Sequence, residues 1–155
     1  MNKKIILIVI CLFANSCGFQ PLYKNININK INIQKIIYSG DNSLVYLIKS
    51  YLNLNETNKP NGFKINLSIN ENISSSNKNT SGITIEEKIL ISVKMQIYDS
   101  KDELIAEEIF TSSNNLQISN NTSADQELKN IKRTNLTQNL AQKIKFKIQL
   151  LTKLQ

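Results

Sequence analysis

The chain has 155 residues, no histidine, no tryptophan, two cysteines and a formal net charge of +7. Metal sites built from histidine, and nucleophiles activated by histidine, are therefore excluded. The length suits one domain with a modest apolar core.

The first residues have the layout of an export signal. Asn2-Lys3-Lys4 is cationic, residues 5–13 are continuously apolar, and Ala14-Asn15-Ser16-Cys17 is small or polar. A cationic end, an apolar segment and a cleavage site of small residues are typical of such signals. The apolar stretch is far shorter than the roughly 20 residues of a membrane-spanning helix. We therefore expect cleavage rather than permanent membrane insertion.

Cys17 indicates which kind of signal this is. The segment ending in Cys17 resembles a bacterial lipobox, which implies cleavage between Ser16 and Cys17 and acylation of Cys17 with diacylglycerol and palmitate. Ala14 stands where leucine is most frequent, and Asn15 is unusual, so a plain secretory signal with an incidental cysteine is the alternative. Gly18 favours the outer membrane, since an aspartate there would retain the protein at the inner membrane.

Processing changes the composition that reaches the envelope. Loss of residues 1–16 removes Lys3 and Lys4 and leaves 139 residues with a net charge of +5. Lipid on Cys17 would leave no free thiol for a disulfide or for catalysis. A basic surface could face lipid phosphates or another anion, or simply be soluble. No nucleic-acid partner is expected, because an exported lipoprotein would not meet one.

The mature chain begins with a tether, residues 17–30, followed by one domain, residues 31–155. A first strand is expected near Ile31–Tyr38, and residues 39–42 form a dense turn signal. Ser43 could then cap a helix over residues 44–54, where apolar residues recur at helical spacing. Pro60 and Gly62 prevent its continuation.

Three strands should form an antiparallel meander with one face exposed to solvent. The first covers residues 63–70, where apolar and polar residues alternate, and a polar loop is expected over 74–81. The second covers 88–97, with a possible extension back through Ile83 and Ile85. A turn at residues 99–102 leads to the last strand, 104–111, and a second polar loop follows over 112–121.

A long helix should close the domain. Ser123 and Gln126 have the spacing of a capping box, and the helix should run to about Leu151. The apolar stripe should consist of Leu128, Ile131, Leu136, Leu140, Ile144, Ile148 and Leu151. The solvent-exposed sides should carry Lys129, Lys132, Arg133, Lys143, Lys145 and Lys147. This stripe could cover the sheet or lie on a membrane. We expect an α+β two-layer sandwich, with a mixed four-stranded sheet and two helices on one face.

The clustered acids do not predict an active site. Glu86 and Glu87 are adjacent, as are Glu107 and Glu108. Adjacent residues of a strand point to opposite faces, so neither pair can share one site for acid–base catalysis. The sequence therefore predicts a protein that is not an enzyme and carries neither a cofactor nor a metal.

Residues 17–23, Cys-Gly-Phe-Gln-Pro-Leu-Tyr, resemble the start of the mature LPS-assembly lipoproteins of the LptE family, especially its alphaproteobacterial branch. The order of predicted elements is similar as well. The resemblance implies an outer-membrane lipoprotein that plugs the LptD β-barrel, assists its assembly and helps deliver lipopolysaccharide to the outer leaflet. The alternative is a periplasm-facing lipoprotein that carries an amphiphilic ligand without a barrel partner.

One departure from the family concerns lipopolysaccharide contact. Members of the alphaproteobacterial branch often carry an arginine before the long central strand, where this chain has Thr84-Ile85-Glu86-Glu87-Lys88. Lys88 and Lys94 could replace that cation on the wet face, or they could be ordinary solvated surface lysines.

Overall fold

A computed structural model of the chain describes residues 32–57, 60–119 and 121–153. Its elements are β1 (Ile33–Gly40), α2 (Asn42–Leu52), β2 (Phe63–Lys78), β3 (Thr84–Tyr98), β4 (Leu104–Gln117) and α3 (Thr122–Lys153). The strands form one four-stranded sheet in the order β1-β2-β3-β4. β1 and β2 are parallel, whereas the other two pairs are antiparallel. The expected α+β sandwich with a mixed sheet is confirmed.

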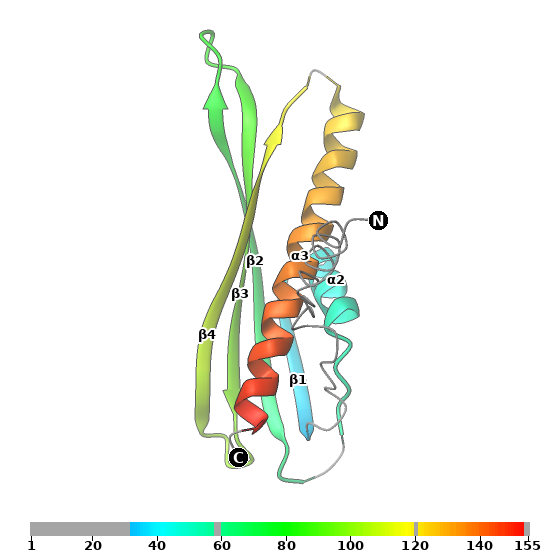
Figure 1. Cartoon of the computed structure of the whole chain (residues 1–155), viewed down its shortest axis with the longest axis vertical. Coiled ribbons are helices and arrows are strands. Elements are labelled where there is room, and N and C mark those ends of the chain that lie inside the picture. Colours follow the sequence, from blue (N-terminus) through cyan, green and yellow to red (C-terminus); the bar gives the residue numbers. More distant parts are fainter. Residues whose placement is uncertain (1–31, 58–59, 120, 154–155) are drawn as a thin grey trace, which may run out of the picture.

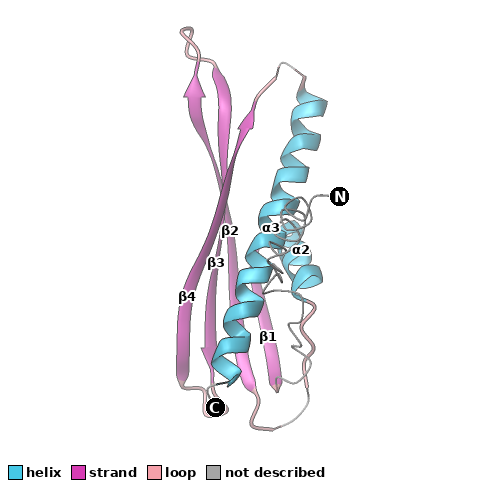
Figure 2. Ribbon diagram, in the orientation of Figure 1, coloured by secondary structure: helices cyan, strands magenta, loops and turns pink. Residues whose placement is uncertain are grey.

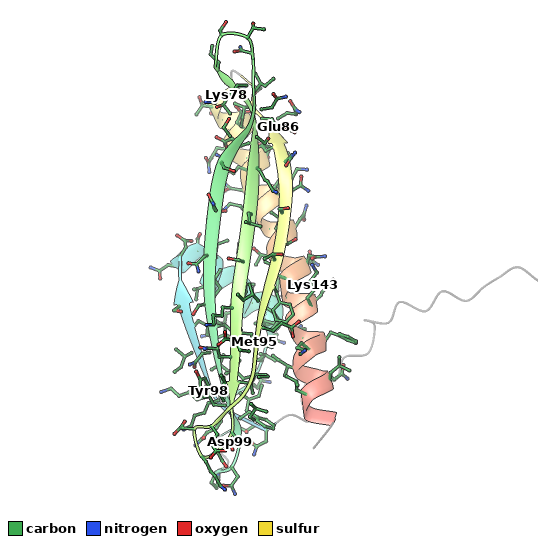
Figure 3. The ribbon with its side chains drawn as sticks, turned by 90° about the vertical axis from the view of Figure 1, so that its left-hand side faces the viewer. Lys78, Glu86, Met95, Tyr98, Asp99 and Lys143 are labelled. Atoms are coloured by element: carbon green, nitrogen blue, oxygen red, sulfur yellow. The ribbon has the colours of Figure 1, made fainter. Side chains whose placement is uncertain are left out.

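Both helices lie on one side of a long, twisted sheet (Figures 1 and 2). We call the end of the sheet beyond Lys78 and Glu86 the distal end, and the end at Tyr98 and Asp99 the basal end (Figure 3). α3 begins at the distal end and runs along the sheet to the basal end, whereas β1 and α2 occupy only the basal part (Figure 1). The basal half therefore has more elements packed together than the distal half.

The apolar core lies between the sheet and the two helices. Alternate residues of β3 from Ile89 to Ile97 are buried, and on β2 the same pattern holds from Ile65 to Ile69. α2 contributes Leu44, Ile48 and Leu52 to this core, and α3 contributes Leu136, Leu140, Ala141, Ile144 and Ile148. The period-2 and helical patterns in the sequence thus place the expected residues in one core.

The strands extend well beyond the apolar segments that predict them. β2 continues to Lys78 and β4 continues to Gln117. The polar loops expected over 74–81 and 112–121 are therefore largely strand, with only the ends of those segments outside the sheet. β3 starts at Thr84, so its possible backward extension includes Ile85 but not Ile83. Ser- and Asn-rich segments have low strand propensity, but here both pair with β3 and gain ladder hydrogen bonds.

Both helices begin at residues other than those predicted. Asp41, not Ser43, caps α2: its Oδ1 accepts hydrogen bonds from the backbone N–H groups of Ser43, at 3.0 Å, and Leu44, at 3.1 Å. The Ser43 hydroxyl also donates to this carboxylate and, together with the Leu44 N–H, lowers the pKa of Asp41. The Asn121 side chain caps α3 by accepting a hydrogen bond from the Ala124 N–H at 3.2 Å. Ser123 therefore lies inside the helix, and the predicted capping box is wrong.

Gly40 allows the tight passage from β1 into α2. Its φ is +124°, and an added Cβ would lie 2.0 Å from the carbonyl oxygen of Ile69. Any other residue would therefore clash with the backbone of β2 through its side chain, and its own backbone would adopt a conformation that L residues rarely occupy. The turn signal at residues 39–42 reflects this constraint, although Ser39 and Gly40 still belong to β1.

The first turns of α3 have a different orientation from the predicted one. Leu128 and Ile131 are 38% and 49% exposed, so the apolar stripe begins only at Leu136. Lys129 and Arg133, expected on the wet side, instead face acidic residues of the sheet. The error has a physical cause. The sheet presents the Glu71 and Glu87 carboxylates opposite this part of the helix, so Arg133 and Lys129 turn toward the sheet.

Within the part of the chain that the structure describes, three ion pairs join α3 to the sheet. Arg133 Nε lies 2.7 Å from Glu71 Oε1 on β2, and Lys129 Nζ lies 2.8 Å from Glu87 Oε2 on β3. At the basal end, the partners are Lys147 and Glu108, 2.6 Å apart. Glu87 Oε2 is buried without a hydrogen bond of good geometry among the described residues, so the Lys129 ammonium neutralises it by proximity alone.

Candidate interaction surface

The outward face of the sheet is the candidate functional surface, because both helices lie on the other face (Figure 1). Most of the side chains at its centre are uncharged and polar, with Lys88, Lys94 and Glu107 as the charged exceptions and Leu90 and Ile109 as the apolar ones. The strand register places them in rows across β2, β3 and β4: Asn66–Gln96–Glu107, Ser68–Lys94–Ile109, Asn70–Ser92–Thr111, Asn72–Leu90–Ser113 and Ser74–Lys88–Asn115. A sheet with one covered and one free face has this alternation.

The charges on this face are largely neutralised by neighbours. Lys94 Nζ lies 3.0 Å from Glu107 Oε1, and Gln96 Nε2 donates to Glu107 Oε2 at 2.7 Å. These contacts, the Gln96 hydrogen bond first, lower the pKa of Glu107. Nearer the basal end, Lys64 pairs with Asp102 at 2.6 Å. Lys94 and Lys64 on the outward face are therefore each compensated by a carboxylate.

Lys88 and Lys94 are the two cations singled out as possible lipopolysaccharide contacts. Both lie on the outward face, as predicted, but Lys94 is held by Glu107 and Lys88 is exposed. Six positions separate them on β3, which places their Cα atoms about 20 Å apart at a rise of about 3.3 Å per residue. The two lysines do not form a single anion site.

The adjacent acidic pairs do point to opposite faces, as predicted. Glu86 accepts a hydrogen bond from Ser76 at 3.0 Å on the outward face, whereas Glu87 meets Lys129 of α3. Glu107 meets Lys94 outside, and Glu108 meets Lys147 inside. Among the described residues, no cluster of three or more acidic or cysteine side chains has an arrangement that could hold a metal ion.

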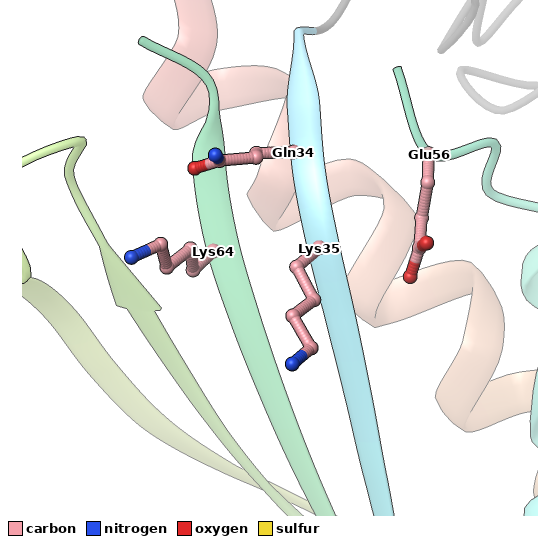
Figure 4. A pocket seen from close by; sticks show the side chains of 4 residues that line it. All are labelled: Gln34, Lys35, Glu56 and Lys64. Atoms are coloured by element: carbon pink, nitrogen blue, oxygen red, sulfur yellow. The ribbon is translucent and has the colours of Figure 1, made fainter. Parts of the chain in front are cut away.

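A polar pocket of about 380 Å³ lies beside the basal part of β1. Gln34, Lys35, Glu56 and Lys64 line it (Figure 4). Glu56 already accepts a hydrogen bond from the Ile36 N–H at 2.8 Å, and Lys64 already pairs with Asp102. All four lining residues are polar or charged, unlike the lining of the apolar cavities that enclose amphiphiles.

The two edges of the sheet differ in how they are protected. At β1, the segment after α2 closes the edge: Thr57 N–H donates to the Ile33 carbonyl at 2.6 Å, and Glu56 binds the Ile36 N–H. Burial, together with the nearby Glu56 carboxylate, raises the pKa of Tyr38 on this strand to about 12. β4 has no comparable cover in the described part of the chain. Sequence reasoning missed this long open edge, because it ended the strand at Thr111.

The predicted anchor lies outside the described part of the chain. Ser16 and Cys17, and the boundaries at residues 16 and 30, fall outside the described residues. None of the helices that the structure describes is both long and apolar enough to cross a membrane. Lipid attachment at Cys17 therefore stays a prediction from the sequence.

Comparison with known proteins identifies the fold but no sequence family. No family model matches the chain, and no curated protein matches its sequence. Among solved structures, it is similar to the rare lipoprotein B of Shewanella oneidensis, with 11% identity, a TM-score of 0.58, and 77% of this chain and 96% of that one covered. Lipoprotein B of Nitrosomonas europaea has 10% identity and a TM-score of 0.62, with 79% of this chain and 86% of that one covered. The fold of this chain is thus that of the rare lipoprotein B (LptE) structures.

Proposed function

We propose that this protein is an outer-membrane lipoprotein that binds inside an LptD-like β-barrel, assists assembly of that barrel, and helps deliver lipopolysaccharide to the outer leaflet. Lipid on Cys17, exposed by cleavage after Ser16, anchors it at the periplasmic face. The role is non-catalytic, since it requires an anchor and a rigid surface rather than reactive groups. The fold shared with rare lipoprotein B supports this proposal.

The observation that carries the proposal is the outward face of the sheet, which neither of the described helices covers. Water-filled barrel interiors are lined with polar side chains. A plug therefore needs a rigid surface that forms hydrogen bonds without burying unpaired charges, which cost several kcal/mol each. The Ser, Asn, Thr and Gln side chains across β2, β3 and β4 supply such hydrogen-bonding groups, and Lys94 and Glu107 neutralise each other. Lys88 is the one charge of these rows without an ion-pair partner among the described residues, and it lies toward the distal end.

Copurification tests the proposal directly. The tagged full-length precursor, expressed in its own host so that it is processed and lipidated, should bring down a large β-barrel from detergent-solubilised outer membrane. Depleting the protein should lower the amount of assembled barrel. Failure to recover any large β-barrel would overturn the proposal.

A pair of variants shows which surface is used. Ser92→Arg places a charge at the centre of the outward face, whereas Gln138→Arg places the same charge on an exposed position of α3. The Ser92 variant should lose the barrel, and the Gln138 variant should keep it. Equal recovery with both variants would show that the outward face is not the contact surface. Cys17→Ser should release the protein from the membrane fraction, which tests the anchor separately.

A further inference from the structure

The free edge of β4 has a defined hydrogen-bonding pattern. The Ile118 N–H donates to the Ile85 carbonyl at 2.9 Å, which fixes the even-numbered residues of β4 as those bonded to β3. Because the ladder of an antiparallel pair alternates, the odd-numbered residues direct both their N–H and C=O groups away from the sheet. From residue 109 to the end of the strand, these residues are Ile109, Thr111, Ser113, Asn115 and Gln117.

This edge lacks the devices that usually prevent strand pairing. Natural edge strands are blocked by charges, prolines, bulges or a covering segment. Residues 109–118 contain no charge, proline or glycine, and their pairing with β3 is regular. Ser113, Asn114 and Asn115 are exposed although their side chains alternate between faces, so α3 does not cover the strand there. Within the described residues, one hydrogen bond reaches the backbone groups at the open edge of this stretch: the Lys143 ammonium donates to the Thr111 carbonyl at 3.3 Å.

We propose that the β4 edge binds an extended segment of a partner protein by strand addition, with an acidic side chain of that segment next to Lys143. Strand addition satisfies the free backbone groups of both chains, and flanking side chains supply specificity. Lys143 lies beside β4 (Figure 3) and is exposed, so a carboxylate can replace the Thr111 carbonyl as its partner. Ile109, 62% exposed on the outward face, favours an apolar residue opposite it.

Charge argues against a second copy of this chain as the occupant. Antiparallel pairing of two β4 edges across a twofold axis keeps both α3 helices on the same face of the joined sheet. Each copy would then bring its Lys143 and Lys147 toward those of the other, and among the described residues Lys147 has an ion-pair partner, Glu108, whereas Lys143 has none. A partner strand with a carboxylate meets no such repulsion.

The test uses the mature protein and a synthetic peptide of alternating valine and threonine ending in two glutamates. Amide hydrogen exchange should be fast at the odd-numbered residues of β4 in the free protein, and the peptide should slow it at those residues alone. A peptide N-methylated at the positions that would donate to β4, and one with lysine in place of glutamate, should bind at least about tenfold more weakly.

Ser113→Pro provides the matched variant. Proline is tolerated in an edge strand at a position whose N–H would point away from the neighbouring strand, as that of Ser113 does. The hydrogen bonds between β4 and β3 therefore stay intact, while strand addition at the open edge is blocked. Ser113→Ala should bind the peptide like the parent protein. If the proline variant unfolds, Thr111→Lys with Asn115→Lys blocks the edge by charge instead.

Each result decides the proposal. Alternating protection that Ser113→Pro abolishes supports it. Absence of protection with the glutamate peptide, or protection unaffected by Ser113→Pro, would overturn it. Concentration-dependent dimerisation with the same alternating protection in the absence of peptide would assign the edge to a second copy and overturn the choice of partner.

Discussion

The two halves of α3 are attached to the same sheet in different ways. From Leu136 onward, the helix packs through buried apolar side chains such as Leu140 and Ile144. From Thr122 to Asn135 no side chain of the helix is buried, and the described contacts with the sheet include the Lys129 and Arg133 ion pairs. Apolar packing stabilises roughly in proportion to the area buried, whereas partly exposed ion pairs contribute less and weaken in salt.

The difference indicates that one helix serves two purposes. Its basal half closes the core and should share the stability of the whole domain. Its distal half lies along a long, mostly polar hairpin and contributes no buried side chain of its own, although Leu116 of β4 is buried there. Segments with few buried contacts open at lower free energy than the core. We therefore expect the distal half of α3 to unfold locally before the basal half does.

The largest expected effect comes from removing a side chain in the basal half. Leu140→Ala deletes a fully buried side chain and should lower the free energy of unfolding by about 2–5 kcal/mol. Leu128→Ala makes the same chemical change on the same helix at a 38% exposed position. It should alter stability by less than about 0.5 kcal/mol. Urea unfolding of the mature chain with Cys17→Ser measures both, and equal losses would refute the described orientation of α3.

A smaller effect is expected from breaking the distal attachment. Arg133→Met leaves Glu71, whose side chain is 17% exposed, without its 2.7 Å partner, and should cost about 1–3 kcal/mol. The double variant Arg133→Met/Glu71→Met should recover much of that loss, because no uncompensated carboxylate remains. Hydrogen exchange should accelerate from Thr122 to Asn135 more than from Leu136 to Leu151.

Lys132→Met is the matched control, since Lys132 is half-buried on the same turn of the helix and makes no ion pair among the described residues. Its stability should stay close to that of the parent protein. If Lys132→Met were as destabilising as Arg133→Met, loss of a general basic charge, rather than the Glu71 contact, would be the cause. Added salt should reduce the difference in the free energy of unfolding between Arg133→Met and the parent protein, because salt screens the ion pair.

The same division explains which structural predictions succeeded. Where apolar side chains alternate, as on β3, or recur at helical spacing, as at Leu140 and Ile144, the sequence pattern identified element and face correctly. In the distal half, the orientation of α3 depends on Glu71 and Glu87, which come from strands far away in the sequence. No pattern within the helix sequence indicates those contacts. The spacing of apolar residues therefore predicts Leu128 and Ile131 on the buried face, whereas they are exposed.

The strand ends follow the same rule. Ser74 and Asn115 belong to β2 and β4 because β3 provides hydrogen-bonding partners for both, and pairing overrides their weak strand propensity. The outward face could be predicted from alternation, and with it the placement of Lys88 and Lys94. The open β4 edge could not, because it appears only once the strand is seen to pass Thr111.

The smallest expected effect concerns the cap at the distal start of α3. Asn121→Ala removes the side-chain acceptor of the Ala124 N–H and should cost about 1 kcal/mol. Ser123→Ala, at the position that the sequence pattern favoured, should cost less, because the structure places Ser123 inside the helix. Because this turn carries no buried side chain, the loss should appear mainly as faster amide exchange in the first turns of α3. A uniform acceleration along the whole helix would mean that its two halves open together, and the contrast between them would not hold.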